Sequence, residues 1–504
     1  MLQSSRRSSR TPKVVVIGAG IGGLTAAALL AKRGYAVKVF DQAIVPGGCA
    51  STFKRGGFTF DVGATQVAGL EPGGIHQQIF EELEIPLPEA SICDPACAVF
   101  LPNETVPINV WRDPQRWQAE RQRQFPGSEP FWQRLASLFE YSWRFQSRDP
   151  VLPPRSGWDM WQLIAALRPD TLLTVPYMFS TVAQLLKSYG LRCDRRLKTF
   201  LDLQLKLYSQ VDADQTALLY AATALGVSQS PQGLYHLHGS MQALSDRLAE
   251  ALRRDGGELY MRHRAEQILL EQGRPRFVRI TDEKRGESWL EPADHVVANV
   301  TVQNLVELLG TQAPVGYRQR INKLPPASGA FVVYLGVEQA AVPTSCPPHL
   351  QFLYDYDGPI GENNSLFVSV SRPGDGRAPT GKATVIASTF TEVSAWQRTA
   401  DYEQLKQQYT EQAIARLGRY FDLRPAHLLQ VEAATPRTFE HYTARYQGTV
   451  GGIGQRLSTF GPFGFANRTP VPHLWLVGDC THPGEGTAGV SYSALTAVRQ
   501  IEAS

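Results

Sequence analysis

Residues near the start of the chain have the types and spacing needed to hold a dinucleotide. The pattern GxGxxG is formed by Gly18, Gly20 and Gly23, and Ile21 and Gly22 between the last two are also candidates for cofactor binding. Asp41 follows Gly23 by 18 residues. A glycine turn lets the backbone approach a diphosphate, and a carboxylate at this spacing accepts hydrogen bonds from both ribose hydroxyls. A glycine turn of purely structural use is the alternative. The carboxylate would repel a 2′-phosphate, which leaves NAD or FAD.

The elements that must position these residues follow in order. Val14–Ile17 is predicted to be a buried strand, residues 21–33 an Ala- and Leu-rich helix, and Val37–Phe40 a second strand that ends at the acid. The first glycine allows the tight turn, Gly20 allows close approach of the diphosphate, and Gly23 allows the helix to pack on the strand. The helix N-terminus then offers free N–H groups and the positive end of its dipole to the phosphates.

Three further segments contain glycine turns beside short elements. VPGGCASTFKRGGFTFDVGATQ includes a strand at Phe58–Asp61, and NAD domains have no need of this insertion. The middle of the chain has a helix from about Ser240, a turn at Gly256–Gly257 and two strands. The C-terminal segment has a strand at Leu474–Val477 and a helix from about Ala488.

These segments resemble those of FAD-dependent amine oxidases and carotenoid desaturases. The resemblance implies non-covalent FAD with backbone contacts at Gly47, Gly48, Gly63, Ala64 and Thr65. It also implies that the backbone of Ala265 holds adenine and that Asp479, in a Gly478-Asp479 pair, bonds the ribityl chain. N–H groups at the helix start, at Ala488, Gly489 and Val490, would point at the pyrimidine carbonyl, where charge accumulates on reduction.

Two longer stretches, HPGEGTAGVSYSALTAVRQI and TPRTFEHYTARYQGTVGGIGQR, are most similar to the cyanobacterial-type carotenoid 3′,4′-desaturase branch of the phytoene desaturase and carotene isomerase family. The chain departs from many relatives at the paired glycines. Those relatives have arginine on both sides, whereas here Val45 precedes Pro46 and Cys49 follows Gly48. This leaves open whether a guanidinium contacts the phosphates.

The resemblance implies an α/β fold of the amine oxidase and GDP dissociation inhibitor type. A discontinuous Rossmann-like FAD-binding domain is expected from residues 13–95, 235–310 and 465–504. An interleaved α+β substrate domain is expected from residues 96–234 and 311–464, and residues 1–12 are expected to be a disordered basic tail.

Three functions fit this arrangement. The leading one is an FAD-dependent desaturase that removes a hydride and a proton from a carotenoid, with quinone or oxygen as the undetermined final acceptor. The second is a carotene cis-trans isomerase that uses reduced FAD. The third is a non-catalytic lipid-binding protein similar to GDP dissociation inhibitors, against which Asp41 and Asp479 both argue. His482 and Glu485 are candidate proton acceptors beside the flavin loop, or simply loop residues that form hydrogen bonds, so no catalytic residue is assigned.

A hydrocarbon substrate must be collected from a membrane, and one segment suits that task. Thr171–Leu186 is a charge-free run of 16 residues, too short to span a bilayer. Its flanking aromatic and basic residues are Trp158, Trp161, Lys187, Arg192, Arg195, Arg196 and Lys198. Such flanks are typical of a segment lying in the lipid interface, so residues 157–198 are predicted to bind a membrane peripherally. A core helix broken at Pro176 is the alternative.

Bulk composition limits the remaining classes. The net charge of +3 does not indicate a nucleic-acid binder. Six scattered cysteines do not form a disulfide framework, and Cys93 and Cys97 have no second Cys/His pair at zinc spacing, so no metal site is expected. The scattered cysteines also favour a reducing compartment. With no secretory h-region before the glycine turn, we expect association with the cytoplasmic side of a membrane.

Overall fold

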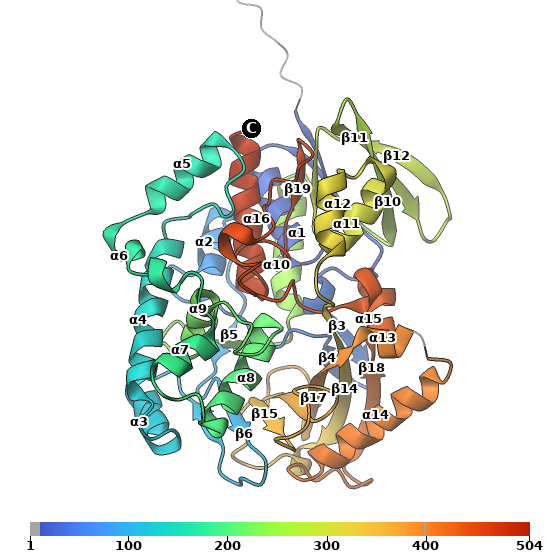
Figure 1. Cartoon of the computed structure of the whole chain (residues 1–504). Helices are drawn as coiled ribbons and strands as arrows, with labels where there is room; N and C mark the ends of the chain where they lie inside the picture. The colour runs from blue at the N-terminus through green and yellow to red at the C-terminus, as the bar shows by residue number, and fades with distance from the viewer. Residues whose placement is uncertain (1–10, 398) are drawn as a thin grey trace, which may run out of the picture.

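The computed structural model describes residues 11–397 and 399–504 (Figure 1). Most of the predicted basic tail, residues 1–10, lies outside the described part. The described chain forms two units that meet around a large cavity, and both mix helices with sheets. The predicted α/β class is confirmed.

The first unit is built on a five-stranded parallel sheet whose strands come from three distant parts of the chain. In spatial order the strands are β19 (Leu474–Leu476), β13 (His295–Ala298), β1 (Lys13–Ile17), β2 (Ala36–Asp41) and β9 (Glu258–Met261). Each neighbouring pair is parallel, so the carboxyl ends of all five strands lie at one edge. Loops that follow β1, β2, β13 and β19 therefore meet at that edge.

Helices cover one face of this sheet. They are α1 (Ile21–Lys32), α10 (Gln242–Arg254) and α16 (Thr487–Glu502), with α2 (Ile75–Glu82) beside them. All of α1 from Ile21 to Ala31 is buried, because α10 and α16 pack against it. This burial explains why α1 is rich in alanine and leucine rather than amphipathic.

The opposite face carries a small antiparallel sheet and two helices. They are β10 (His263–Glu271), β11 (Arg274–Asp282), β12 (Ser288–Pro292), α11 (Val302–Leu309), η3 (Gly310–Gln312) and α12 (Val315–Asn322). Ala313 and Ile321 are buried in the same hydrophobic cluster as Val15 and Val296. The first unit therefore continues past the predicted boundary at residue 310, because α12 packs on α11.

The second unit contains a seven-stranded sheet. Its order is β18 (Leu428–Ala434), β14 (Ser328–Glu338), β17 (Lys382–Glu392), β16 (Ser365–Val370), β15 (His349–Leu353), β6 (Cys97–Phe100) and β7 (Ile108–Val110). Associated elements are the hairpin β3 (Thr52–Arg55) and β4 (Phe58–Asp61), η4 (Gln339–Ala341), α13 (Val393–Gln397), α14 (Tyr402–Leu417), α15 (Pro436–Thr443) and η5 (Tyr446–Gly448). Two short elements contact the first unit: Ala50 of η1 (Gly48–Ala50) is buried with Val14 and Val16, and the carbonyl oxygen of Phe463 in η6 (Gly461–Phe463) accepts a hydrogen bond from Arg320. Phe58 lies against Gly336 of β14, where a Cβ would be 2.6 Å from its ring.

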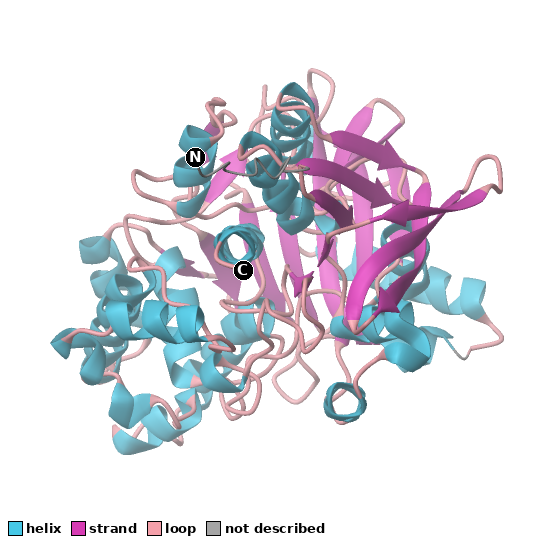
Figure 2. Cartoon of the chain, turned by 90° about the horizontal axis from the view of Figure 1, so that it is seen from above, coloured by secondary structure: helices cyan, strands magenta, loops and turns pink. Residues whose placement is uncertain are grey.

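A group of helices stands beside the strands (Figure 2). They are α3 (Pro114–Gln124), α4 (Glu129–Gln146), α5 (Gly157–Ala166), α6 (Pro169–Leu172), η2 (Val175–Tyr177), α7 (Val182–Ser188), α8 (Arg195–Ser209) and α9 (Leu218–Ser228), on the left in Figure 1. A small sheet of β5 (Ala90–Ile92) and β8 (Tyr235–Leu237) joins them to the rest. Trp117, Trp132 and Phe200 are packed in the core of this group.

The charge-free run predicted to lie in the lipid interface is divided between surface and core. Leu172, Leu173 and Phe179 are exposed, whereas Val182 and Leu185 belong to the helical core. A Thr181–Gln184 capping box starts α7 after the exposed part. The prediction of one interfacial segment is therefore wrong for its second half, because the new helix turns its apolar side chains inward.

Candidate active site

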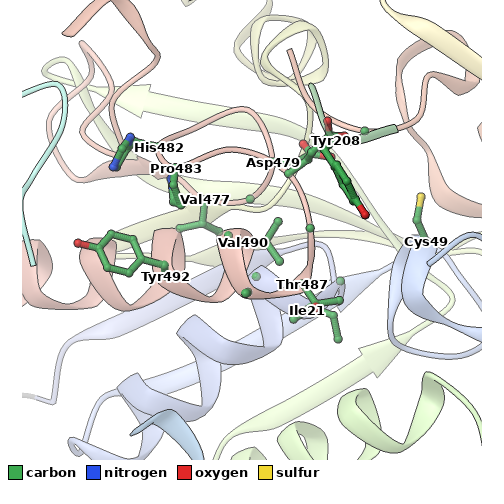
Figure 3. Close-up of a pocket in the computed structure, with 18 of the residues that line it drawn as sticks. Ile21, Cys49, Tyr208, Val477, Asp479, His482, Pro483, Thr487, Val490 and Tyr492 are labelled. Carbon is green, nitrogen blue, oxygen red and sulfur yellow. The ribbon is translucent and has the colours of Figure 1, made fainter. Parts of the chain in front are cut away.

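A cavity of about 1330 Å³ lies between the two units. Its walls include the loops at the carboxyl edge of the parallel sheet, strands β14, β16 and β17, and helices α4, α5, α6, α8 and α9. Figure 3 shows the part of the cavity around the start of α16. The cavity lining includes most of the residues predicted to contact a cofactor: Gly18, Gly20, Ile21, Gly22, Asp41, Gly47, Gly48, Gly63, Ala64, Thr65, Ala265, Gly478, Asp479, Ala488, Gly489 and Val490. Gly23 lies just behind it, in the first turn of α1.

The turn between β1 and α1 has no room for side chains. Gly18 has a φ of +94°, and a Cβ there would be 2.7 Å from the carbonyl oxygen of Asn299. A Cβ on Gly23 would overlap the carbonyl oxygen of Gly18. Gly20 is the N-cap of α1, and no side chain caps the helix. The first N–H groups of α1 are therefore available to an anion in the cavity.

Asn299 is a site residue that the sequence analysis missed. It directly follows β13, and its N–H donates to the carbonyl oxygen of Ile17 at 2.8 Å. Its side chain lies against the glycine turn: a Cβ on Gly20 would be 2.7 Å from Nδ2, and one on Gly478 would be 2.9 Å from Oδ1. A side chain at position 20 would therefore have to displace the Asn299 amide as well as approach any ligand. The available signal was a polar residue at the end of a third buried strand.

Asp41 lies at the end of β2, as the spacing predicts. Oδ2 accepts a hydrogen bond from the N–H of Ala19 at 2.6 Å, and Oδ1 accepts one from Ala43 at 2.7 Å. Burial raises the pKa of Asp41, while these two N–H groups oppose the rise. Each carboxylate oxygen keeps further acceptor capacity. The arrangement fits a carboxylate that is held rigidly and presented to hydroxyl donors.

The paired-glycine loop lies directly on the α1 turn. Gly47 and Gly48 have φ values of +118° and +58°, and the N–H of Gly47 donates to Ala19 at 2.8 Å. A Cβ on Gly48 would be 3.4 Å from the Cα of Gly20. The N–H of Ala64 donates to the carbonyl of Cys49 at 3.0 Å. The predicted contacts of this insertion and of the glycine turn therefore belong to one surface.

The start of α16 forms the other side of this surface. The helix begins at Thr487, one residue before the predicted start, and its N-cap Gly486 has no capping side chain. A Cβ on Gly22 would be 3.3 Å from the carbonyl oxygen of Val490, so the first turns of α1 and α16 are in contact. Ile21 and Thr487, which begin these helices, lie close together in Figure 3. Two uncapped helix N-termini thus converge on the cavity.

The two candidate proton acceptors lie in different surroundings. His482 shares a hydrogen bond between Nε2 and Oε1 of Gln146 at 3.1 Å, and burial lowers the pKa of His482 to about 4. In Figure 3 it lies beside Pro483 and Tyr492, away from Asp479. A histidine with this pKa is neutral at pH 7, so one ring nitrogen carries a proton and the other does not. Its contact with Gln146 uses Nε2.

Glu485 lies on the Asp479 side of the loop. Its Oε2 accepts a hydrogen bond from Nε2 of Gln210 at 2.8 Å, and a Cβ on Gly451 would overlap both atoms. Its Oε1 is buried without a hydrogen-bond partner among the described residues. Burial, assisted by the charge of Asp479, raises the pKa of Glu485 to about 8. Of the two candidates, Glu485 has the pKa suited to gain or lose a proton near neutrality.

The residues present fit FAD. The open N-terminus of α1 suits a diphosphate, that of α16 suits the pyrimidine carbonyl, Asp41 suits ribose hydroxyls, and the glycine positions leave a cradle that any Cβ would fill. The profile of the flavin containing amine oxidoreductase family matches residues 21–502. The chain belongs to this family.

As a member of this family, the chain is an FAD-dependent oxidoreductase. It is similar to the chloroplastic prolycopene isomerase of Daucus carota, with 26% identity over 98% of this chain and 80% of the relative. It is also similar to a 4,4′-diapophytoene desaturase (4,4′-diapolycopene-forming) of Methylomonas sp, with 25% identity over 98% of this chain and 96% of the relative. The predicted resemblance to carotenoid desaturases and isomerases is confirmed.

Among solved structures, an oxidoreductase from Methanosarcina mazei matches with a TM-score of 0.63 and 18% identity, over 97% of this chain and 100% of the other. This likeness concerns the fold. The preference for one desaturase branch stays a prediction.

Proposed function

We propose that this family member is an FAD-dependent carotenoid desaturase. The observation that carries the proposal is the continuity of the cavity. The residues that line it include Gly20 and Asp479 of the cofactor surface, and also Leu172 and Phe463 at the molecular surface. A long, thin, apolar substrate could therefore extend from lipid to FAD without entering water. Bound FAD supplies a hydride acceptor for such a reaction.

The wall between these ends suits a hydrocarbon. The helices contribute Leu163, Leu207, Leu219, Ala224 and Val227, the loop before β8 contributes Leu234, and the sheet contributes Val332, Phe367 and Phe390. Aliphatic and aromatic walls bind a polyene by excluding water, and the shape of the cavity then sets the position of the polyene along it.

Exposed apolar side chains gather on the segment that carries α5, α6 and η2 and on η6, and we call them the apolar rim; four of them, Leu167, Leu172, Val175 and Phe463, also line the cavity. The residues of the apolar rim are Met160, Trp161, Ile164, Leu167, Leu172, Leu173, Val175, Phe179 and Phe463. Trp161 is 65% exposed, Leu172 60% and Phe179 61%, and the rings of Phe179 and Phe463 lie 6.2 Å apart. Large apolar side chains exposed in such number on one segment are typical of a site that meets a membrane or another protein. We propose that the apolar rim rests in a lipid surface and receives carotenoid from it. Among the described residues, no helix is both long and apolar enough to cross a bilayer.

The basic residues that follow the charge-free run contribute less to membrane binding than the sequence predicts. Arg195 pairs with Asp357 at 2.5 Å, Arg196 with Glu104 at 2.8 Å, and Lys198 with Asp202 at 2.8 Å. These charges are largely satisfied within the protein. Membrane binding should therefore depend mainly on apolar burial and only weakly on anionic lipid.

We also propose Glu485 as the proton acceptor. Desaturation needs a group that takes a proton from the carbon next to the one that loses hydride. Glu485 lines the cavity beside Asp479, and its unpartnered Oε1 has acceptor capacity. With a pKa of about 8 it carries out this role best in mildly alkaline solution.

A direct test uses purified protein and liposomes that contain a candidate carotenoid. The protein should be yellow, and acid denaturation should release its FAD, since the contacts are non-covalent. Product that has lost two hydrogens by mass spectrometry supports the desaturase. A colourless protein that FAD does not reconstitute would overturn the proposal.

A carotene isomerase is the second candidate function, and the 26% sequence identity with a prolycopene isomerase favours it. With FAD chemically reduced and oxygen excluded, an isomerase should convert a cis carotenoid to a product of equal mass. A desaturase under the same conditions should have no oxidised FAD to accept hydride and should be inactive.

A further inference from the structure

Arg445 is a largely buried cation at the junction of the two units. It lies between α15 and η5, and its side chain is 18% exposed. Nη1 pairs with Oδ2 of Asp479 at 2.9 Å, Nε donates to the carbonyl oxygen of Thr449 at 2.7 Å, and Nη2 donates to that of Gly451. Although burial disfavours the charge, Asp479 raises the pKa of Arg445 above its ordinary value. Arg445 is therefore a permanent positive charge.

The position of Arg445 connects it to the glycine turn. It lines the cavity beside Cys49 and Asp479, and its charge opposes the burial that raises the pKa of the Cys49 thiol. The residues preceding these two neighbours touch the start of α1. A Cβ on Gly48 would be 3.4 Å from the Cα of Gly20, and a Cβ on Gly22 would be 3.4 Å from the Cα of Gly478. The guanidinium is thus next to the place where the first N–H groups of α1 are open.

The negative charges that gather around the glycine turn favour a cation beside it. Asp41 and Asp479 already place two carboxylates around the glycine turn, and a diphosphate would add two further negative charges. Arg264 also lines the cavity, but it is half exposed and paired with Glu266 at 3.1 Å and Glu283 at 3.0 Å. A guanidinium has five N–H donors, and the three acceptors named above account for three of them among the described residues.

We propose that Arg445 is the guanidinium that binds the diphosphate of FAD. The paired-glycine loop has Val45 and Cys49 where an arginine would serve this purpose, and the loop after α15 brings one to the same place. While it holds the phosphates, Arg445 also neutralises Asp479, so that a carboxylate and a diphosphate coexist in a cavity of low polarity. This inference rests on FAD binding and not on carotenoid chemistry, so its test needs no carotenoid.

The test compares the two halves of the cofactor. Apoprotein, prepared by removing FAD, is titrated with FAD, ADP and riboflavin in a calorimeter. Arg445→Met should weaken FAD and ADP about 10- to 100-fold, as expected for hydrogen bonds to charged groups, and should leave riboflavin unchanged. Arg445→Lys should recover part of the ADP affinity, and the wild-type affinity for ADP should fall more steeply with salt than that of Arg445→Met.

Two controls separate this role from a structural one. Arg437→Met removes an arginine of α15 that bonds the carbonyls of Gln397 and Thr399 outside the cavity, and it should leave all three affinities unchanged. If Arg445→Met fails to fold, the double variant Arg445→Met/Asp479→Asn removes the unpaired charge and should still lose ADP affinity relative to Asp479→Asn alone. Equal losses for ADP and riboflavin, or a loss for riboflavin alone, would overturn the proposal.

Discussion

The two walls of the cavity are made in different ways. The cofactor wall consists of backbone groups at glycine turns and helix N-termini, and much of it comes from consecutive residues such as 18–23 and 47–48. The substrate wall consists of apolar side chains from helices and strands that lie far apart in the sequence, such as Leu163 and Phe390. A backbone site tolerates almost no change in shape, whereas an apolar wall depends on volume and tolerates exchange. Substitutions should therefore have sharply different consequences on the two sides.

The largest effect is expected at the glycine turn. Gly23→Ala should abolish FAD binding and destabilise the fold by more than about 3 kcal/mol, because the new Cβ has to displace the backbone carbonyl of Gly18. FAD per protein from absorbance, together with thermal unfolding, measures both effects. Gly157→Ala in α5 is the matched control, since a Cβ there meets nothing within 4 Å. Full FAD content in the Gly23 variant would contradict the view of a rigid backbone site.

The next largest effect is expected at the ion pair between Arg445 and Asp479, which connects the two units. Asp479→Ala leaves the Arg445 guanidinium buried without its carboxylate, which should cost about 3 kcal/mol of unfolding free energy. The cost should exceed that of removing an exposed pair, for which Arg424→Ala is the control. Chemical denaturation of apoprotein measures both. An equal, small cost in the two variants would show that the Arg445–Asp479 pair does not hold the units together.

A smaller effect is expected from the proton on Glu485. A carboxyl with a pKa of about 8 is protonated at pH 7, so a desaturase that uses the carboxylate should gain activity as the pH rises and level off above about 8. Below that pKa the rate should fall about tenfold per pH unit. Glu485→Gln should be slow at every pH. Initial rates across the range decide the matter, and activity that falls with rising pH would indicate a general acid instead, as an isomerase could use.

The same group has an effect on stability with a fixed sign. Because its pKa is raised in the folded state, the native protein binds more protons than the unfolded chain above pH 4.5. The unfolding free energy of wild type should therefore fall relative to Glu485→Gln as the pH rises from about 4.5 to about 8. Denaturation of both proteins at several pH values tests this difference, which should be flat if the carboxyl ionises normally.

The smallest effect on the folded protein is expected at the apolar rim. Replacing Leu172, Leu173 and Phe179 with serine should leave stability and FAD content nearly unchanged, since all three are exposed. Binding to liposomes should fall, and turnover of liposome-embedded carotenoid should fall more than turnover of detergent-dispersed carotenoid. Replacing the buried Val182, Leu185 and Leu186 with serine should instead unfold the protein. If the rim variants bound liposomes as wild type does, the apolar rim would not be the surface that binds the membrane.

The sequence by itself determined the features that depend on neighbours along the chain. The glycine turn, the helix after it and Asp41 lie within one βαβ unit, where a strand, a turn and a helix admit few alternatives. The fold class followed from the order of such units.

Tertiary structure alone decided which distant residues meet. Asn299 against the glycine turn, Arg445 against Asp479 and Glu485 against Gln210 are contacts between segments separated by tens to hundreds of residues. The separation of His482 from Asp479 within one short loop is also a tertiary feature, because it depends on the direction in which each side chain points. The division of the run 171–186 between surface and core likewise depends on what packs against each turn. Local sequence carries no record of these neighbours, because burial and pairing are set by the packing of the whole chain.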